Sequence, residues 1–418
     1  MATQPYVRAL DAAEFIMGPP TVKGTPMWRG RGVDAVRLLV DDYLALVRER
    51  FPAEVVEHGF LASQADNRRV FGEYGNVYEL TDVPGDPDAQ FRSDNIVASI
   101  ARLERDRSAG PLVAIGAIMR HFPGSTPPLF RDRLVWPVVE LNQLVEAEQA
   151  DSVLDFHRSV VERMLWDIGI PSITVCTDEL AGYGKVTYLV VTALPNRRPT
   201  VLATLYVLAD GLRSALGPRR EIIDIGFTGK VLATAAMLHM DARGLALPST
   251  IAPVQLGVTA APQSDPATCE RWLTGLRAAG LRCEVRQAGG SSRSRARAEE
   301  YWHRTGTPLV IGLDRSPDAV TLCTRFPLHR VPLGELPAPE RVRDLLDRHD
   351  TTLRSRSRRL LETTVERNGH LRTLCPPCAA RPGVAVFGHV VPAKPGDCQE
   401  CGDEAGQPLF LSEEGRFY

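Results

Sequence analysis

The sequence predicts an α+β fold: an antiparallel sheet flanked by helices, then an α/β domain and a small C-terminal metal-binding domain. Apolar, strand-like runs separated by turn residues dominate residues 110–209. Strands and helices alternate after Pro253, as in an α/β domain. Two Cys-x2-Cys pairs follow near the C-terminus. We therefore expect domains at 1–250, 251–345 and 346–418.

The composition is that of a soluble globular protein, with 44% hydrophobic and 24% charged residues among 418. The net charge of −2 excludes attraction of nucleic acids by the molecule as a whole, so any such contact must come from local patches. No apolar run of about 18 residues is present, which predicts no membrane-spanning helix. The N-terminus lacks a basic start followed by an apolar core, so we expect no signal peptide and a cytoplasmic location.

The first 30 residues are rich in glycine and proline and predict loops and turns. Apolar residues then recur at helical spacing over 33–51, which predicts an amphipathic helix. The elements expected after it are a strand and loop at 54–71, a helix at 96–107, strands at 112–122 and 134–141, and a helix at 153–168.

Further strands are expected at 171–175, 185–194 and 200–208. Together with the earlier strands they favour an antiparallel sheet of about six or seven strands. A parallel dinucleotide-binding fold is disfavoured, because no strand leads into a Gly-x-Gly-x-x-Gly turn. The second domain is expected to contain strands at 255–261, 281–287, 308–314 and 319–325, helices at 269–280 and 295–306, and a long helix at 339–369.

The segment 224–258 combines a turn with a helix. Gly226 and Gly229 precede apolar positions at helical spacing, and Gly244 offers a stop for the helix. Lys230 lies in the first turn, where backbone N–H groups and the helix dipole favour an anion. The alternative is a core helix that follows a loop and binds nothing.

The cysteines form two groups. Cys176, Cys269, Cys283 and Cys323 lie in apolar segments and are expected to be buried thiols. The C-terminal four form two C-x2-C pairs separated by 19 residues: Cys375, Cys378, Cys398 and Cys401. This spacing is typical of a structural zinc site with four thiolate ligands, which leaves no open position for catalysis. Disulfides are the alternative.

The segment MLHMDARGLALPSTIAPVQL resembles the third signature motif of archaeal- and eukaryotic-type prolyl-tRNA synthetases, which are class II aminoacyl-tRNA synthetases. The matching residues are His239, Asp241, Arg243, Gly244, Leu245, Leu247, Pro248, Ile251, Ala252, Pro253 and Gln255. The stretch YW…GTPLVIGLDR and a tail ending in Phe417-Tyr418 extend the resemblance. It implies the class II synthetase sheet, an anticodon-binding-like second domain, the C-terminal zinc domain and a homodimer.

The resemblance also implies a site for ATP and Mg²⁺, because these enzymes activate a carboxylate with ATP. Arg120 matches the arginine that holds the α-phosphate, and Arg131 matches an arginine of the returning strand. Two positions depart from the family. Phe122 replaces a glutamate that meets adenine, and Lys230 replaces an arginine on the terminal phosphate, which keeps the charge but loses the planar fork. Arg120 and Arg131 could instead be ordinary surface residues.

The expected acid pocket departs further. Thr187 is retained from the family pattern, but Val191 replaces the glutamate that pairs with the substrate ammonium. A buried ammonium without a partner costs several kcal/mol. The family's Gly-Thr-Ser-His segment corresponds to 203–206, so Thr204 and Tyr206 would line the pocket beside Leu205. An acid without a free amine would suit these residues; alternatively, the former pocket is filled by core packing.

The sequence therefore favours a divergent prolyl-tRNA synthetase paralogue. It would form an acyl-adenylate from a carboxylic or amino acid, with specificity for an acid other than proline. The acyl group would pass to tRNA or to another amine or carrier acceptor. The alternatives are an inactive paralogue that binds RNA or protein as a regulator or scaffold, and a working proline enzyme. Arginine-rich runs at 293–297 and 354–359 fit RNA phosphates or solvated helix faces equally well.

Overall fold

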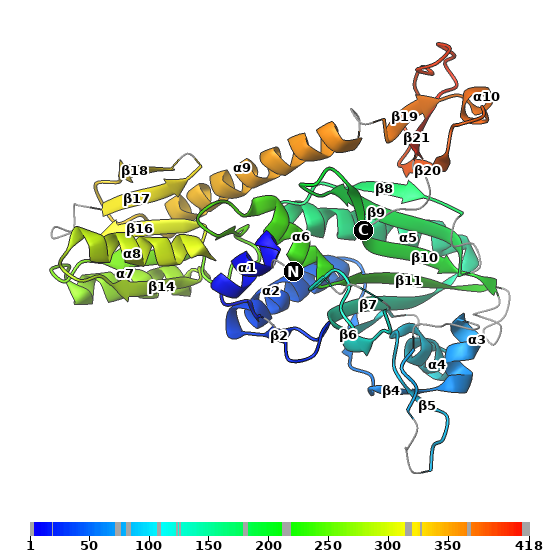
Figure 1. The fold of residues 1–418 in the computed structure, drawn as a ribbon, viewed down its shortest axis with the longest axis horizontal. Coiled ribbons are helices and arrows are strands. Elements are labelled where there is room, and N and C mark those ends of the chain that lie inside the picture. The colour runs from blue at the N-terminus through cyan, green and yellow to red at the C-terminus, as the bar shows by residue number, and fades with distance from the viewer. Residues whose placement is uncertain are drawn as a thin grey trace.

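The protein is elongated, with the α/β unit at one end and the large sheet at the other (Figure 1). The computed structural model describes residues 4–18, 20–71, 77–80, 85–106, 110–122, 124, 127–178, 183–210, 219–313, 320–326, 328–365 and 369–411.

The large sheet has ten strands in the order β19-β21-β20-β8-β9-β10-β11-β7-β6-β3. Its pairs are antiparallel except β3–β6, which confirms the predicted α+β class. Seven strands precede residue 250 and three come from the C-terminal segment. The strands are β3 (Glu54–Val56), β6 (Leu112–Met119), β7 (Leu134–Glu146), β8 (Ile173–Cys176), β9 (Gly184–Ala193), β10 (Pro199–Leu208), β11 (Arg220–Thr228), β19 (Leu371–Leu374), β20 (Val386–Val391) and β21 (Gln407–Leu411).

One face of this sheet is covered by α2 (Gly30–Arg48) and α5 (Ala150–Asp167), as the sequence predicted. Their apolar stripes bury the largest core cluster, in which the rings of Tyr43 and Phe227 meet edge to face at 5.0 Å. The opposite face of the same strands is left to carry polar side chains. This face holds the site described below.

The prediction of loops over the first 30 residues is wrong in part. Pro5 starts helix α1 (Pro5–Ala12), because its fixed φ suits a first helical turn and Tyr6 and Leu10 bury against the core. A short hairpin follows, β1 (Ile16–Met17) with β2 (Met27–Trp28). The loop expected before residue 71 contains β4 (Leu61–Ser63) and α3 (Gln64–Phe71). Further along lie β5 (Ala89–Phe91), α4 (Ile96–Asp106), the 3-10 turn η1 (Ala147–Gln149) and α6 (Lys230–His239).

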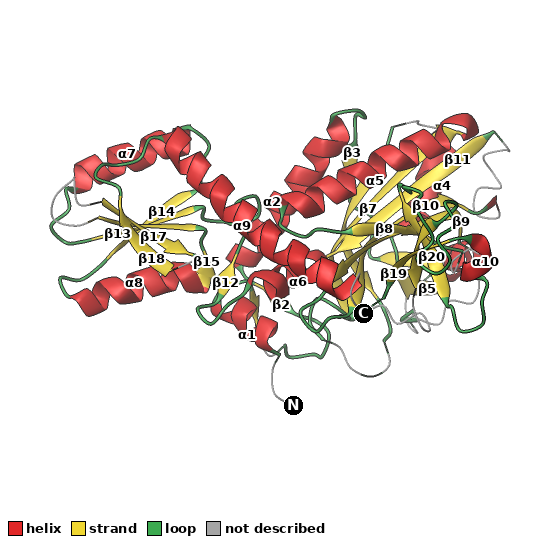
Figure 2. Ribbon diagram, turned by 90° about the horizontal axis from the view of Figure 1, so that it is seen from above, coloured by secondary structure: helices red, strands yellow, loops and turns green. Residues whose placement is uncertain are grey.

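The second unit is a five-stranded sheet in the order β14-β13-β16-β17-β18. Helices α7 and α8 lie on opposite sides of it (Figure 2). The elements alternate as the sequence predicted: β13 (Leu256–Ala260), α7 (Pro266–Ala278), β14 (Cys283–Gln287), α8 (Ser292–Arg304), β16 (Leu309–Leu313), β17 (Val320–Arg325) and β18 (Leu328–Pro332). A two-residue parallel pair, β12 (Leu245–Ala246) with β15 (Thr305–Gly306), links it to the segment after α6.

Helix α9 (Pro339–Val365) runs from the second unit to the C-terminal strands and the short helix α10 (Pro376–Ala379). Those strands join the large sheet where β20 pairs with β8, and Phe410 on β21 packs in one apolar cluster with Val191. Within the described ranges, no helix is both long enough and apolar enough to cross a membrane.

Candidate functional site

Strand register places polar residues in two rows on the open face of the large sheet. In the first row Glu140 faces Gly226, and Gly226 faces Thr204. In the second row Asn142 faces Asp224, which in turn faces Tyr206. Side chains two residues apart on a strand share a face, so both rows point to the same side.

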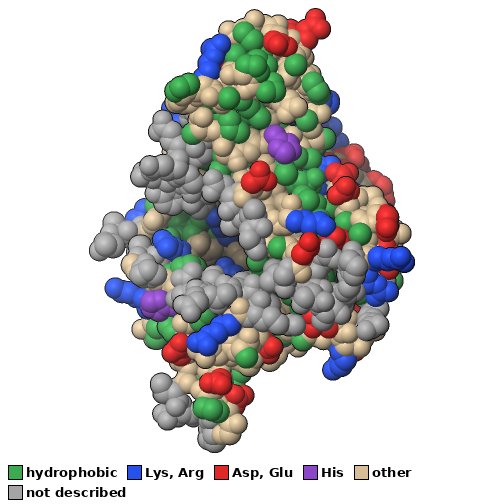
Figure 3. Space-filling model, turned by 90° about the vertical axis from the view of Figure 1, so that its right-hand side faces the viewer, with side chains coloured by type: hydrophobic (Ala, Val, Ile, Leu, Met, Phe, Trp, Pro, Cys, Tyr) green, Lys and Arg blue, Asp and Glu red, His purple; other side chains and the backbone are tan. Residues whose placement is uncertain are grey.

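A cavity of about 910 Å³ lies over these rows. It is lined by six of the residues that the sequence predicted for nucleotide and acid binding: Arg120, Phe122, Arg131, Thr204, Tyr206 and Lys230. On the face shown in Figure 3 the surface is hollowed, and basic side chains lie inside the hollow. The sheet thus brings together side chains that lie more than 100 positions apart in the sequence.

Arg120 lies at the end of β6 and is fixed by two hydrogen bonds. Its Nη2 donates to Asp94 Oδ2 at 2.7 Å, and its Nε donates to the carbonyl of Ser93 at 3.0 Å. Both charged side chains are partly exposed, at 29% and 19%. The guanidinium is therefore held in the cavity wall.

Two cation–aromatic contacts form another wall. The guanidinium of Arg131 lies 5.1 Å from the ring centre of Phe122, and the Lys230 ammonium lies 5.7 Å from that of Phe130. Such contacts hold a cation near an aromatic face without neutralising it. Burial lowers the pKa of Lys230 to about 8. This wall offers positive charge and flat apolar surface to a ligand.

The floor of the cavity is acidic. Burial, followed by the nearby charge of Asp94, raises the pKa of Asp224 to about 7. Burial and the charges of Asp94 and Asp224 raise the pKa of Glu140 well above its ordinary range. Asp224 accepts hydrogen bonds from Asn142 Nδ2 at 2.8 Å and Tyr183 Oη at 2.9 Å. The floor therefore favours a cationic ligand.

Not every predicted pocket residue lines this cavity. Thr187 is buried opposite Tyr206, behind the cavity surface. Val191 lies on β9, two strands away from β11 in the sheet. Leu361 and Phe410 cover its side chain in an apolar cluster. Leu205 points to the other face and packs with the covering helices. Of the residues proposed to bind the acid, Thr204 and Tyr206 reach the cavity.

The four C-terminal cysteines converge as predicted. Their sulfur atoms all lie within 4.8 Å of one another, and the sulfurs of Cys375 and Cys401 are 3.6 Å apart. A disulfide would require about 2.05 Å. Tetrahedral thiolates around zinc, with bonds of about 2.3 Å, would stand about 3.8 Å apart. The donor set therefore fits a structural zinc ion. The predicted Phe417-Tyr418 terminus lies outside the described residues.

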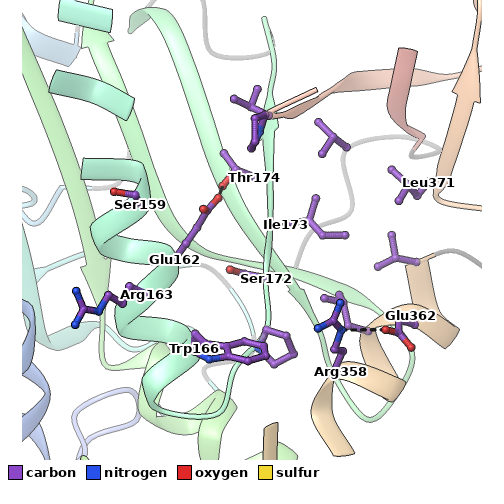
Figure 4. Close-up of a pocket in the computed structure, with 16 residues that line it drawn as sticks. Ser159, Glu162, Arg163, Trp166, Ser172, Ile173, Thr174, Arg358, Glu362 and Leu371 are labelled. Atoms are coloured by element: carbon purple, nitrogen blue, oxygen red, sulfur yellow. Dashed lines mark hydrogen bonds and ion pairs between the residues drawn. The ribbon is translucent and has the colours of Figure 1, made fainter. Parts of the chain in front are cut away.

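A second cavity, of about 720 Å³, lies between α5, α9 and the C-terminal strands (Figure 4). Its acidic groups are already engaged. Glu162 accepts from Arg158 at 2.7 Å and from Thr174 at 2.5 Å, and Glu362 accepts from Arg358 at 3.1 Å. None of the residues predicted to bind the nucleotide, the acid or zinc lines it.

Comparison with known proteins finds similar sequences and a similar structure that carry the same kind of name. The proline–tRNA ligase of Aeropyrum pernix is 26% identical over 282 residues, which span 59% of this chain and only 56% of that protein. That of Thermococcus kodakarensis is 25% identical over 390 residues, 83% of this chain and 78% of that protein. The prolyl-tRNA synthetase of Cryptosporidium parvum, solved with halofuginone and AMPPNP, has the same fold, with a TM-score of 0.81 at 15% identity over 99% of this chain and 97% of that chain.

The chain is a divergent relative of the prolyl-tRNA synthetases. The resemblance predicted from the sequence is thereby confirmed, although no protein-family profile matches the chain. The Cryptosporidium structure establishes the fold, and the low identities leave the site to be argued from its own residues.

The residues that carry the resemblance to prolyl-tRNA synthetases lie mainly outside the cavity. The carboxylate of Asp241 accepts from Arg325 at 2.6 and 2.8 Å, and Arg325 also donates to the carbonyl of Gly244 at 3.0 Å. Gly244 has φ +128°, and a Cβ there would meet the Arg304 backbone at 2.7 Å. His239 is buried, which lowers its pKa to about 3. These residues hold the second unit against α6.

Sequence reasoning about this synthetase relative missed several cavity residues, among them Asp94, Glu140, Asp224 and Tyr183. Two of them had a detectable signal. Glu140 lies in the apolar run VVELNQL and Asp224 in IIDIG, and a carboxylate inside a buried strand usually has a specific role. Asp94 and Tyr183 are in irregular segments, where no such contrast marks them.

Proposed function

We propose that the chain is an ATP-dependent ligase of the class II aminoacyl-tRNA synthetase type. It would form an acyl-adenylate and pass the acyl group to tRNA or to another amine or carrier acceptor. The observation that carries this proposal is the cavity whose walls carry Arg120, Arg131 and Lys230 and whose floor carries carboxylates. A nucleotide and an acid could therefore meet in one cavity.

Arg120, Arg131 and Lys230 would bind the phosphates and stabilise the negative charge that develops on the leaving pyrophosphate. Phe122 would stack on the adenine ring. Mg²⁺, which the resemblance implies, would be held largely by the phosphates and would neutralise part of their charge. The substrate carboxylate attacks the α-phosphorus, so the chain need not supply a nucleophile.

The acid would lie over Thr204, with Tyr206 as a wall. The acidic floor argues against the expected acid without a free amine. An acid without an amine would leave Asp224 and Glu140 facing an uncharged ligand, whereas a cationic nitrogen would compensate them. We therefore propose an amino acid as the substrate. The domain divisions at residues 250 and 345, a cytoplasmic location and a homodimer complete the proposal.

The test is ATP–pyrophosphate exchange with the purified full-length chain over a panel of amino acids and other carboxylic acids. Exchange that depends on one acid, and that is lost without Mg²⁺, would support the ligase. The competing function is an inactive paralogue that binds RNA or protein, and the ion pair that already engages Arg120 favours it. Absence of exchange with every acid, together with ATP-independent RNA binding, would establish that alternative. Proline-dependent exchange with tRNA charging would instead reveal a working proline enzyme.

A further inference from the structure

Glu140 on β7 and Asp224 on β11 flank an open patch of the cavity floor. Glu140 faces Gly226 across the two strands, and Asp224 precedes Gly226 by two residues on the same face. Within the part of the chain that the structure describes, a Cβ at Gly226 would meet only Thr204 Oγ1, at 3.8 Å. The missing side chain therefore leaves room for a ligand group between the two carboxylates.

The hydrogen bonds of Glu140 leave one oxygen available. Its side chain is 4% exposed and lines the cavity. Oε2 accepts from the Asn95 N–H at 3.2 Å, whereas Oε1 has no hydrogen-bond partner among the described residues. Asp94 lies close enough to share a proton with Glu140, and a bound cation would displace that proton because it favours the ionised form of both carboxyls. An unpaired buried acceptor on a residue that lines the cavity indicates a donor on the ligand, because leaving it unpaired is unfavourable.

Asp224 is bonded but not neutralised. Its two oxygens accept from Asn142 and Tyr183, and both donors are uncharged. The ring of Tyr183 meets that of Tyr206 edge to face at 4.7 Å, so aromatic groups stand beside the carboxylates. Aromatic faces and carboxylates both attract a cation.

The charges of the floor can be counted. When all three are ionised, Asp94, Glu140 and Asp224 contribute −3, and a bound cation favours this ionised state because it opposes the raised pKa of Glu140 and Asp224. Arg120, paired with Asp94, and Arg92, near Glu140, contribute +2, which leaves −1. Arg92 does not bond to Glu140, because its guanidinium donates to the carbonyls of Gly59 at 2.8 Å and Ala117 at 2.6 Å. An ordinary amino acid is a neutral zwitterion and leaves this charge in place, whereas one with a second cationic nitrogen cancels it.

We propose that Glu140 and Asp224 bind a second cationic nitrogen on the side chain of the substrate, which makes the substrate a dibasic amino acid bearing an ammonium or guanidinium group. The inference rests on the proposed function for the identity of the site. The reacting carboxylate would lie toward Arg120 and Lys230, and the side-chain cation would lie over Gly226. Glu140 and Asp224 are thus specificity-determining residues.

The test is isothermal titration calorimetry without ATP, using matched pairs of probes. Ornithine is compared with norvaline, which lacks only the second amine, and arginine with citrulline, whose urea is neutral. We expect at least one dibasic member to bind about tenfold or more tightly than its neutral partner. Glu140→Gln and Asp224→Asn should each abolish that preference. Glu146→Gln removes an exposed carboxylate from the same strand β7 and should leave it unchanged.

Three outcomes would overturn the proposal: equal binding within both pairs, no binding of either dibasic probe at millimolar concentration, or a preference that survives both cavity substitutions. Circular dichroism and melting temperature show whether each variant is folded. Pyrophosphate exchange separates this inference from the ligase. A dibasic preference in binding without exchange would reject the ligase and retain the inference, whereas exchange driven by a neutral amino acid, with no dibasic preference, would do the reverse.

Discussion

Arg120 and Asp94 form an ion pair, with Nη2 and Oδ2 2.7 Å apart, at the wall of the main cavity. A second bond, from Arg120 Nε to the Ser93 carbonyl, fixes the plane of the guanidinium. The arginine is therefore oriented before any ligand arrives. Preorganised donors of this kind stabilise developing charge without further rearrangement.

Replacing Arg120 tests this arrangement. Arg120→Lys keeps the charge but loses the planar fork that Ser93 and Asp94 orient. We expect pyrophosphate exchange to fall about 100-fold. The control is Arg37→Lys, because Arg37 is 72% exposed and, within the described part of the chain, pairs only with Asp34, three residues away. Equal activities of the two variants would contradict a phosphate-binding role for Arg120.

Lys230 predicts an alkaline limit on nucleotide affinity. Its pKa is lowered to about 8 by burial, so the side chain is charged at pH 7 and loses its proton as the pH rises through 8. The affinity for a non-hydrolysable ATP analogue should then weaken by up to about tenfold per pH unit. Lys230→Arg stays protonated and should remove this dependence. Fluorescence titration from pH 6.5 to 9.5 measures both proteins, and parallel pH profiles would count against Lys230 as a phosphate ligand.

Asp224 predicts a pH dependence of stability. Burial and Asp94 raise its pKa in the folded protein to about 7, from an ordinary value of 3.8. A raised pKa stabilises the fold fully below the ordinary value, and this contribution is lost as the pH rises through about 7. The pKa of Glu140 is also raised, so its ionisation changes the stability of the fold in the same direction. Asp94, Arg120 and the hydroxyls of Tyr183 and Tyr206 are the other charged or titratable groups near Asp224 in the cavity.

Asp224→Asn removes the ionisation. The variant should therefore be more stable than the parent at pH 8, by on the order of 1 kcal/mol, and its stability should fall less between pH 5 and 8. Urea unfolding at several pH values measures this. A variant that loses stability equally at every pH would show that the hydrogen bonds of Asp224, rather than its charge, determine the effect.

The four-cysteine cluster predicts one tightly bound zinc ion per chain. Cys378→Ser should lose the metal and lower the melting temperature by several degrees, because the strands that the metal organises also pair with β8. Elemental analysis and thermal melts provide the readouts. Cys176→Ser is the control, since this thiol lies on β8 outside the cluster, and it should retain the metal. Purified protein without metal, and with an unchanged melting temperature in Cys378→Ser, would contradict the prediction.

The sequence was most informative where local pattern decides structure. Helical spacing predicted α2 and α5, and the alternation after Pro253 predicted the second unit, because both are set by neighbouring residues. The segment that resembles the third synthetase motif was less informative about the chemistry of the site. Asp241 and Gly244 contact Arg325 at the junction with the second unit, so their presence reflects a shared fold.

The site was predictable only in part, because strand register assembles it. Arg120 and Lys230 could be named by family pattern, and both reach the cavity. Val191 was assigned to the pocket by the same pattern. Its burial depends on Leu361 and Phe410, which approach from the far end of the chain, and no local signal could reveal that cover. Of the acidic floor, Asp94 lies in an irregular segment that gave no signal, whereas the carboxylates of Glu140 and Asp224 inside apolar strands were a local signal that was missed.

The pairing of β20 with β8 has a consequence for solubility. Ile173–Cys176 would otherwise present a row of unsatisfied backbone N–H and C=O groups on a short apolar strand, which is a template for self-association. The C-terminal strands cap that exposed edge. A chain truncated after Val365 should therefore aggregate, and metal starvation in a cell would first appear as insoluble protein.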